Sequence, residues 1–156
     1  MFNVSKRIAR VAQRNATLLT TPNRGIKLHE YQAGSLLSSF NVSIPLGEVA
    51  KTADEAVKIA SKFDNGCVVK SQILGGGRGQ GHIKETGFQG GVKLVDTAEQ
   101  AGKLATEYLG KHLVTKQSGE EGLPVNFVYL VQKININKEM YLSLTLDRAG
   151  GCPVFI

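Results

Sequence analysis

The sequence has no tryptophan, only two cysteines and no long apolar stretch. Two cysteines are too few for a disulfide scaffold and cannot alone make a four-ligand zinc site. The three histidines lie far apart with no ligand spacing, so no metal centre is predicted within this chain. No apolar run approaches the roughly 20 residues that a membrane helix needs, so no membrane partner is predicted. The hydrophobic fraction of 42% is nevertheless normal for a globular core.

Acidic residues are absent before Glu30, and this sets residues 1–26 apart from the rest of the chain. Removing the five basic residues of this segment from the total of 19 leaves 14 basic against 13 acidic residues. The positive charge therefore belongs to the first segment, and the body is close to neutral. With Val4, Ile8 and Val11 along one side of a helix and arginines along another, the segment is typical of a mitochondrial transit peptide. The alternative is a solvated basic tail. We expect cleavage near residue 26 and a location in the mitochondrial matrix or a related organelle.

Beyond this segment, short helical and strand patterns follow one another, which predicts an α+β fold with a mixed or antiparallel sheet and packed helices. Thr52 with Glu55, and Asp96 with Glu99, are predicted helix caps. The expected helices cover 29–40, 52–63 and 96–110, and the expected strands cover 45–50, 67–73, 92–95, 112–116, 126–136, 139–147 and 153–156. Because the last of these strands ends without cover, we expect a truncated chain.

Residues 74–91 contain eight of the 18 glycines. Glycine permits positive φ and a close approach of backbone N–H groups to an anion, as phosphate binding requires. The segment lacks the Gly-Lys-Ser/Thr end of a Walker A loop and the glycine spacing of a dinucleotide fingerprint. By glycine content alone, a flexible loop between two strands is at least as good a prediction as a phosphate-covering loop.

Lys70 interrupts the apolar run of the strand predicted at 67–73. A lysine in such a run needs an anion near its ammonium, unless it lies on the exposed face of an edge strand. Beside a glycine-rich loop, Lys70 and Arg78 together are able to hold two parts of a polyphosphate. Glu139 opens the last long predicted strand. It is a candidate acceptor for ribose hydroxyls, with a solvated turn residue as the alternative.

Six ordered blocks of the sequence form a specific set. They are LHEYQA at 28–33, VVKSQILGGGRG at 68–79, GGVKL at 90–94, LVTKQ at 113–117, PVN at 124–126 and EMYL at 139–142. Together they resemble the β subunit of succinyl-CoA synthetase (succinate–CoA ligase), an ATP-grasp protein. The resemblance implies that residues 27–156 are the N-terminal, incomplete part of an ATP-grasp nucleotide-binding domain. It also implies a tricarboxylic acid cycle ligase that interconverts succinate, CoA and ATP with succinyl-CoA, ADP and phosphate.

Carried over position by position, the resemblance makes Lys70 a phosphate contact. It assigns further nucleotide contacts to Gly77, Arg78, Gly79 and Glu139, and a base-contacting hinge to the segment from Val131 to Ile134. Pro45 stands where guanine-specific relatives tend to carry a glutamine, which favours adenine. Gln80 replaces a lysine of the family, and Lys84 is the candidate substitute for that cation.

The resemblance further implies ATP or GTP as the nucleotide, Mg²⁺ with ligands beyond Ile156, and an α subunit that carries a phosphohistidine. CoA and succinate are the implied substrates, and the chain alone is expected to be inactive. Neither a catalytic residue nor a metal ligand is assigned within it. Two alternatives remain: another acyl-CoA ligase, such as a malate–CoA ligase or a citrate lyase lobe, and a basic Gly-Arg nucleic-acid binder. The near-neutral body and the single arginine of the loop disfavour nucleic acid as a partner.

Overall fold

The structure, a computed structural model, describes residues 26–156. The predicted transit peptide, residues 1–26, therefore lies outside the described residues except for Ile26. In chain order the elements are α2 (Glu30–Ser39), β1 (Gly47–Ala50), α3 (Ala53–Ala60), β2 (Cys67–Ser71), the 3-10 helix η1 (Arg78–Gln80), β3 (His82–Ile83), β4 (Val92–Val95), α4 (Ala98–Tyr108), β5 (His112–Val114), β6 (Leu123–Pro124), β7 (Val128–Gln132), β8 (Leu144–Asp147) and β9 (Cys152–Phe155). In this part of the chain, every helix is too short or too polar to cross a membrane.

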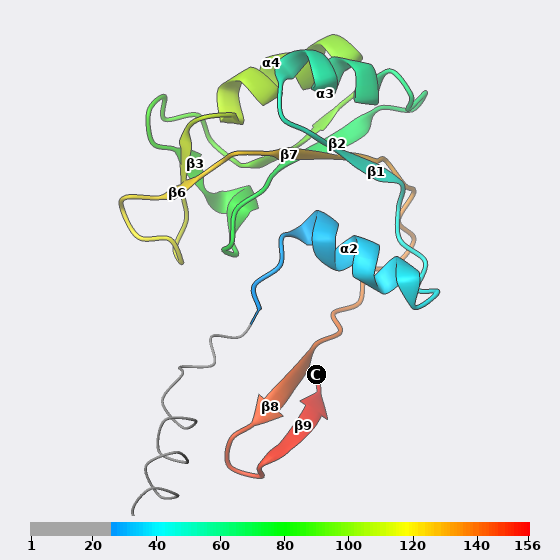
Figure 1. The fold of residues 1–156 in the computed structure, drawn as a ribbon, viewed down its shortest axis with the longest axis vertical. Coiled ribbons are helices and arrows are strands. Elements are labelled where there is room, and N and C mark those ends of the chain that lie inside the picture. Colours follow the sequence, from blue (N-terminus) through cyan, green and yellow to red (C-terminus); the bar gives the residue numbers. More distant parts are fainter. Residues whose placement is uncertain (1–25) are drawn as a thin grey trace, which may run out of the picture.

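The main sheet has the strand order β1-β7-β2-β4, and every pairing in it is antiparallel. Helices α3 and α4 cover one face of this sheet, and α2 lies on the other side (Figure 1). Strands β3, β5 and β6 form a second small sheet, and the β8–β9 hairpin projects away from both. The predicted α+β fold with an antiparallel sheet and packed helices is confirmed.

The core lies between the main sheet and the helix pair α3–α4. Its fully buried apolar residues include Ala56, Val69, Ala101, Ala105, Tyr108 and Leu130. Small residues on the two helices let them approach closely: a Cβ added to Gly102 of α4 would meet Val57 of α3 at 2.6 Å. This packing fixes the sheet whose other face turns toward α2.

The predicted cap of α3 is confirmed, and the predicted cap of α4 is wrong by one residue. The hydroxyl of Thr52 accepts a hydrogen bond from the N–H of Glu55 at 3.1 Å. In α4 the capping residue is Thr97, whose hydroxyl accepts from the N–H of Gln100 at 3.3 Å. The Gln100 side chain in turn accepts from the N–H of Asp96 at 3.0 Å. A threonine in extended conformation thus does the capping that the sequence pattern assigned to its acidic neighbour.

Two strands are much shorter than predicted. The strand expected at 126–136 is β7, and the one expected at 139–147 is β8, which keeps only the second half of that range. Strand β7 ends where its neighbours β1 and β2 end, because a strand without a partner leaves its backbone groups unpaired. Glu139 consequently lies in an exposed connection without regular secondary structure and does not open a strand.

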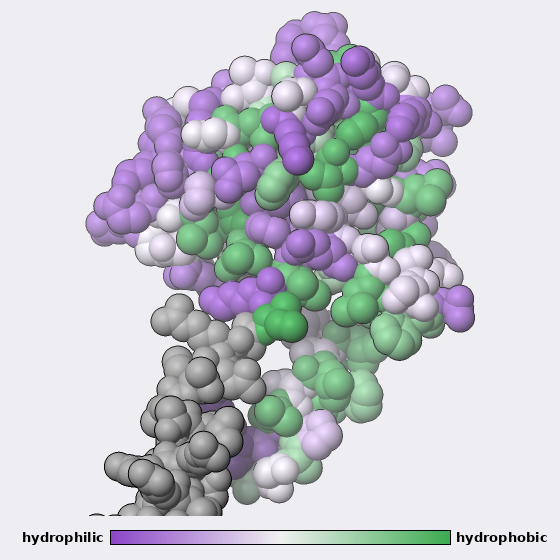
Figure 2. Space-filling model, viewed as in Figure 1, coloured by the Kyte–Doolittle hydropathy of each residue, from purple (hydrophilic) through white to green (hydrophobic). Residues whose placement is uncertain are grey.

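Helix α2 differs from α3 and α4 because none of its residues is fully buried. Its apolar side chains Leu36 and Leu37 are about half exposed. Figure 2 shows hydrophobic residues at the surface in its lower part, over the β8–β9 hairpin. Against the sheet, Tyr31 packs near the rings of Phe127 and Tyr129 at centroid distances of 6.3 Å. A further link to the sheet is made by charges at the first turn of α2.

Candidate functional site

Lys70 lies on β2, an inner strand that pairs with β4 on one side and with β7 on the other. The alternative of a solvated lysine on an edge strand is therefore wrong. The Lys70 ammonium is 2.7 Å from a carboxylate oxygen of Glu30, and the lysine side chain is only 24% exposed. The anion that the sequence argument required is thus a residue of the first turn of α2.

Arg78 reaches the same carboxylate from the glycine-rich loop. Its NH2 nitrogen is 2.6 Å from the second oxygen of Glu30, and its NH1 nitrogen donates to the carbonyl of Ser71 at 2.8 Å. Gly77 precedes it with a φ of 76°, a left-handed conformation that glycine adopts without strain. Lys70 and Arg78, predicted separately, are brought together at one point.

Glu30 was missed as a site residue, although it lies in the LHEYQA block. A carboxylate in the first turn of a helix has an ordinary explanation, since negative charge there is favoured by the helix dipole. Its two partners are 40 and 48 residues away in sequence, so no local pattern connects them. The signal that was available was Lys70 itself, since a strand lysine calls for an acidic partner.

The electrostatics of this cluster leave it positive. Burial alone would raise the pKa of Glu30, but the hydrogen bonds and charges of Lys70 and Arg78 outweigh burial and hold the pKa below its ordinary value. Two cations share one carboxylate, so the three side chains carry a net charge of +1. Nearby, burial together with the Glu30 charge raises the pKa of Tyr129.

The glycine-rich loop is tied to its surroundings at several points. The N–H of Gly76 donates to the side chain of Gln117 at 2.8 Å, and the N–H of Gly91 donates to the carbonyl of Arg78 at 2.8 Å. At the far end of the loop, the buried Tyr108 hydroxyl donates to the carbonyl of Gly90 at 2.8 Å. Among the described residues other than its chain neighbours, none has an atom within 4 Å of a Cβ added to Gly79, so there is space beside this residue. These hydrogen bonds hold the loop in place, and the side of the loop at Gly79 stays open.

A hollow of about 350 Å³ lies beside the Glu30–Lys70–Arg78 cluster, next to the residues that precede α2. It is lined by Lys27, Leu28, Glu30, Ile73, Leu74, Gly75 and Arg78. The cluster and the loop therefore face an accessible volume. Lys84, the candidate substitute for the missing loop cation, does not line this hollow, and its ammonium pairs with Glu121 at 2.6 Å.

The residues predicted to meet the base lie at the β1–β7 edge of the same sheet. The N–H of Gln132 donates to the carbonyl of Leu46 at 2.8 Å, which places Pro45 next to the end of β7. Val131 is 6% exposed and pairs with residues of both β1 and β2, so its backbone lies inside the sheet. Ile134 follows the end of β7 and is 51% exposed.

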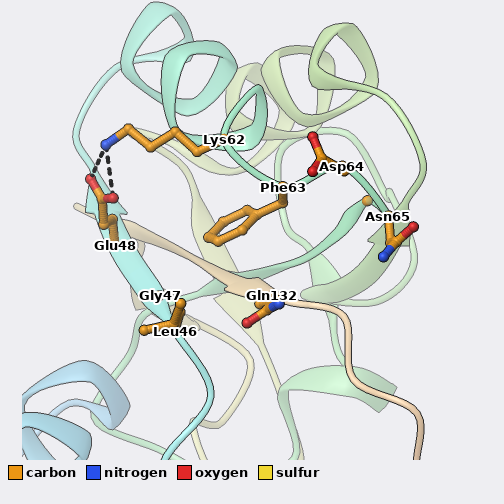
Figure 3. A pocket seen from close by; sticks show the side chains of 9 residues that line it. Leu46, Gly47, Glu48, Lys62, Phe63, Asp64, Asn65 and Gln132 are labelled. Atoms are coloured by element: carbon orange, nitrogen blue, oxygen red, sulfur yellow. Dashed lines mark hydrogen bonds and ion pairs between the residues drawn. The ribbon is translucent and has the colours of Figure 1, made fainter.

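A second hollow, of about 500 Å³, lies at this edge (Figure 3). Phe63 and Gln132 face it, and the Lys62–Glu48 ion pair, 2.7 Å long, spans its rim. Within residues 26–156, Glu139 forms neither a hydrogen bond nor an ion pair with Lys70 or Arg78. The structure thus gathers the phosphate candidates in one cluster and the Pro45–Val131 pair in another, and it leaves Glu139 apart.

Two cations beside a glycine-rich loop, in an α+β fold with an antiparallel sheet, define a candidate polyphosphate site. In agreement, an ATP-grasp domain model matches residues 27–156, and the chain belongs to the ATP-grasp family. The chain is also homologous to β subunits of succinate–CoA ligases, as the sequence resemblance indicated.

Three relatives illustrate this similarity. The ADP-forming mitochondrial succinate–CoA ligase β subunit of Dictyostelium discoideum is 42% identical over 94% of this chain and 33% of its own length. The GDP-forming mitochondrial subunit of the same organism is 44% identical over 85% of this chain and 32% of its own. The ADP-forming hydrogenosomal subunit of Neocallimastix frontalis is 41% identical over 100% of this chain and 36% of its own length. The chain thus spans about a third of the length of these relatives.

Proposed function

We propose that residues 27–156 form the N-terminal, nucleotide-binding part of a succinate–CoA ligase β subunit. The observation that carries this proposal is the meeting of Lys70 and Arg78 on one carboxylate beside the glycine-rich loop. The homology to succinate–CoA ligase β subunits supports the same function.

The residues of the cluster fit a nucleoside polyphosphate. The cluster keeps a net positive charge, and both cations retain N–H groups that Glu30 does not use. In the proposed site Lys70 acts as a point charge on the phosphates, and Arg78 with the loop N–H groups of Gly77 and Gly79 holds a second part of the chain. The ribose and base extend toward the β1–β7 edge, where residues 133–136, directly after Gln132, are not part of a strand.

Pro45 favours adenine in this proposal, because proline offers no side-chain hydrogen bond to a guanine edge. Relatives of both the ADP-forming and the GDP-forming kind are similar to this chain, so the choice of nucleotide rests on Pro45 and its place beside β7. Glu139 is proposed to approach the ribose only when the nucleotide is bound, since its connection lies away from the cluster. Mg²⁺ would neutralise phosphate charge during transfer. Residues 26–156 bring together no group of three His, Cys, Asp or Glu side chains that would hold it.

The proposed whole enzyme pairs this β subunit with an α subunit and makes succinyl-CoA from succinate, CoA and ATP. The proposed location is the mitochondrial matrix or a derived organelle, since the relatives include mitochondrial and hydrogenosomal subunits. The test is to assemble the complete β subunit that carries this chain with its α subunit. Succinyl-CoA formation should then be measured with ATP or GTP, and with succinate or malate. Succinate- and ATP-dependent activity is expected; activity with malate alone would favour the malate–CoA ligase alternative.

A further inference from the structure

Glu30 joins the two cations of the proposed phosphate site. One carboxylate oxygen lies 2.7 Å from the Lys70 ammonium, and the other lies 2.6 Å from the Arg78 guanidinium. Because each oxygen has its own partner, the width of a single carboxylate sets the distance between the two cations. The three side chains are 33%, 24% and 20% exposed in the order Glu30, Lys70, Arg78, so solvent screens them only in part.

The carboxylate uses only a fraction of the available donors. An ammonium has three N–H groups and a guanidinium has five, whereas Glu30 takes one nitrogen of each residue. The Ser71 carbonyl occupies a further nitrogen of Arg78. Both cations therefore keep donors for a phosphate oxygen while Glu30 stays in place, so the carboxylate need not leave when an anion arrives.

Without the carboxylate, the two cations would repel each other. Lys70 has a flexible stem of four methylene groups, and within residues 26–156 its ammonium forms a hydrogen bond or ion pair only with Glu30. The neighbouring residues on its own strand give no second anchor, whereas Arg78 keeps its bond to Ser71. Loss of Glu30 would thus leave Lys70 mobile and the spacing of the pair undefined.

We infer that Glu30 is a positioning residue: it holds the Lys70 ammonium and the Arg78 guanidinium at a defined spacing beside the loop that is proposed to bind the phosphates. The inference rests on the proposed function and extends it to a residue outside the nucleotide contacts that the resemblance assigns. The same kind of pair, a strand lysine held by a helix glutamate, is required for phosphoryl transfer in protein kinases, which is an analogy from an unrelated fold. The opposite role, a carboxylate that occupies the phosphate position and competes with it, predicts an opposite change in affinity.

The test uses the complete β subunit assembled with its α subunit, and ATP as the probe in isothermal titration. Glu30→Gln keeps the size of the side chain and removes its charge. We expect ATP affinity to fall about tenfold and the KM for ATP to rise by a similar factor, while the KM values for succinate and CoA stay unchanged. Since Glu30 acts through the cations, its effect combined with Lys70→Met should be smaller than the product of the two single effects.

The matched control is Gln32→Ala. The Gln32 side chain accepts a hydrogen bond from the N–H of His29 at 2.9 Å and so supports the start of α2 without touching either cation. This variant should leave ATP affinity within about twofold of the wild type. If it weakens binding as much as Glu30→Gln does, Glu30 acts only through the stability of α2 and the inference is overturned.

Unchanged or tighter ATP binding by Glu30→Gln, or effects that multiply fully with Lys70→Met, would also overturn the inference. The proposed function is tested separately by Lys70→Met alone. If that variant weakens ATP binding and Glu30→Gln does not, only the positioning role fails. If Lys70→Met has no effect either, the phosphate site itself is in the wrong place. Melting temperatures of all variants show that the compared proteins are folded.

Discussion

Replacing Lys70 by methionine removes the charge that the proposed site needs and keeps most of the bulk of the side chain. In the structure this substitution breaks one ion pair, 2.7 Å long, and leaves Glu30 paired with Arg78 alone. The net charge of the cluster falls from +1 to zero. A phosphate would therefore lose one charge-assisted contact and would face a neutral pair in place of a positive cluster.

The substitution should lower the affinity for ATP more than the stability of the fold. A charge-assisted hydrogen bond is worth roughly 1.5–3 kcal/mol, so ATP affinity should fall on the order of 10- to 100-fold. The cost in folding should be smaller, about 1 kcal/mol, because the broken pair is partly solvated, Glu30 keeps one partner, and methionine gains apolar burial. Binding should therefore weaken much more than the protein is destabilised.

The assay is isothermal titration of ATP into the assembled enzyme, with a denaturation curve for each variant. The control is Lys103→Met, since Lys103 lies on α4 with 75% of its side chain exposed and, within residues 26–156, forms an ion pair only with Glu99, at 2.7 Å. That variant should bind ATP like the wild type. If Lys70→Met also binds within twofold of the wild type while folded, Lys70 serves only to hold α2 to the sheet, and the reasoning fails.

Three further predictions concern other parts of the chain. Pro45→Gln should shift the preference from ATP toward GTP by roughly five- to tenfold through one added hydrogen bond, measured as the ratio of the two affinities; an unchanged ratio would separate Pro45 from base choice. The backbone and imidazole of His112 hold the pKa of Glu85 at about 2, so its contribution to stability is full above pH 4.5 and lost as the pH falls toward 2. Glu85→Gln should flatten that part of the acid-unfolding curve. Replacing Arg7, Arg10 and Arg14 by glutamate in a fusion of residues 1–30 to a reporter should abolish its import into mitochondria, and continued import would contradict a transit peptide.

Local elements were predictable because their signals lie close together in sequence. The range expected for the strand at 92–95 matches β4, and the predicted cap of α3 at Thr52 is present. The limits of β7 and β8 were not predictable, because the pattern shows which residues could form a strand and not where the partner strand ends. The strand expected at 139–147 illustrates this, because only the second half of that range pairs with β9.

The sequence indicated which residues belong to the candidate site, but it did not indicate that they meet at one carboxylate. Lys70 stood out because a lysine in an apolar run needs an anion, and the glycine-rich loop stood out by composition. Their meeting through Glu30 spans 40 to 48 residues of sequence and depends on α2 docking under β2, which no local pattern indicates. In the same way, Glu121, the ion-pair partner of Lys84, is 37 residues away in sequence, and no local pattern connects the two.

The central claim is that Lys70 and Arg78 bind the phosphates of a nucleotide, and a structure of the assembled enzyme with a non-hydrolysable ATP analogue tests it most directly. The account predicts that the Lys70 ammonium and the Arg78 guanidinium each lie within about 3 Å of a phosphate oxygen, with Glu30 still bridging them. A nucleotide bound with its phosphates away from both side chains would contradict the claim.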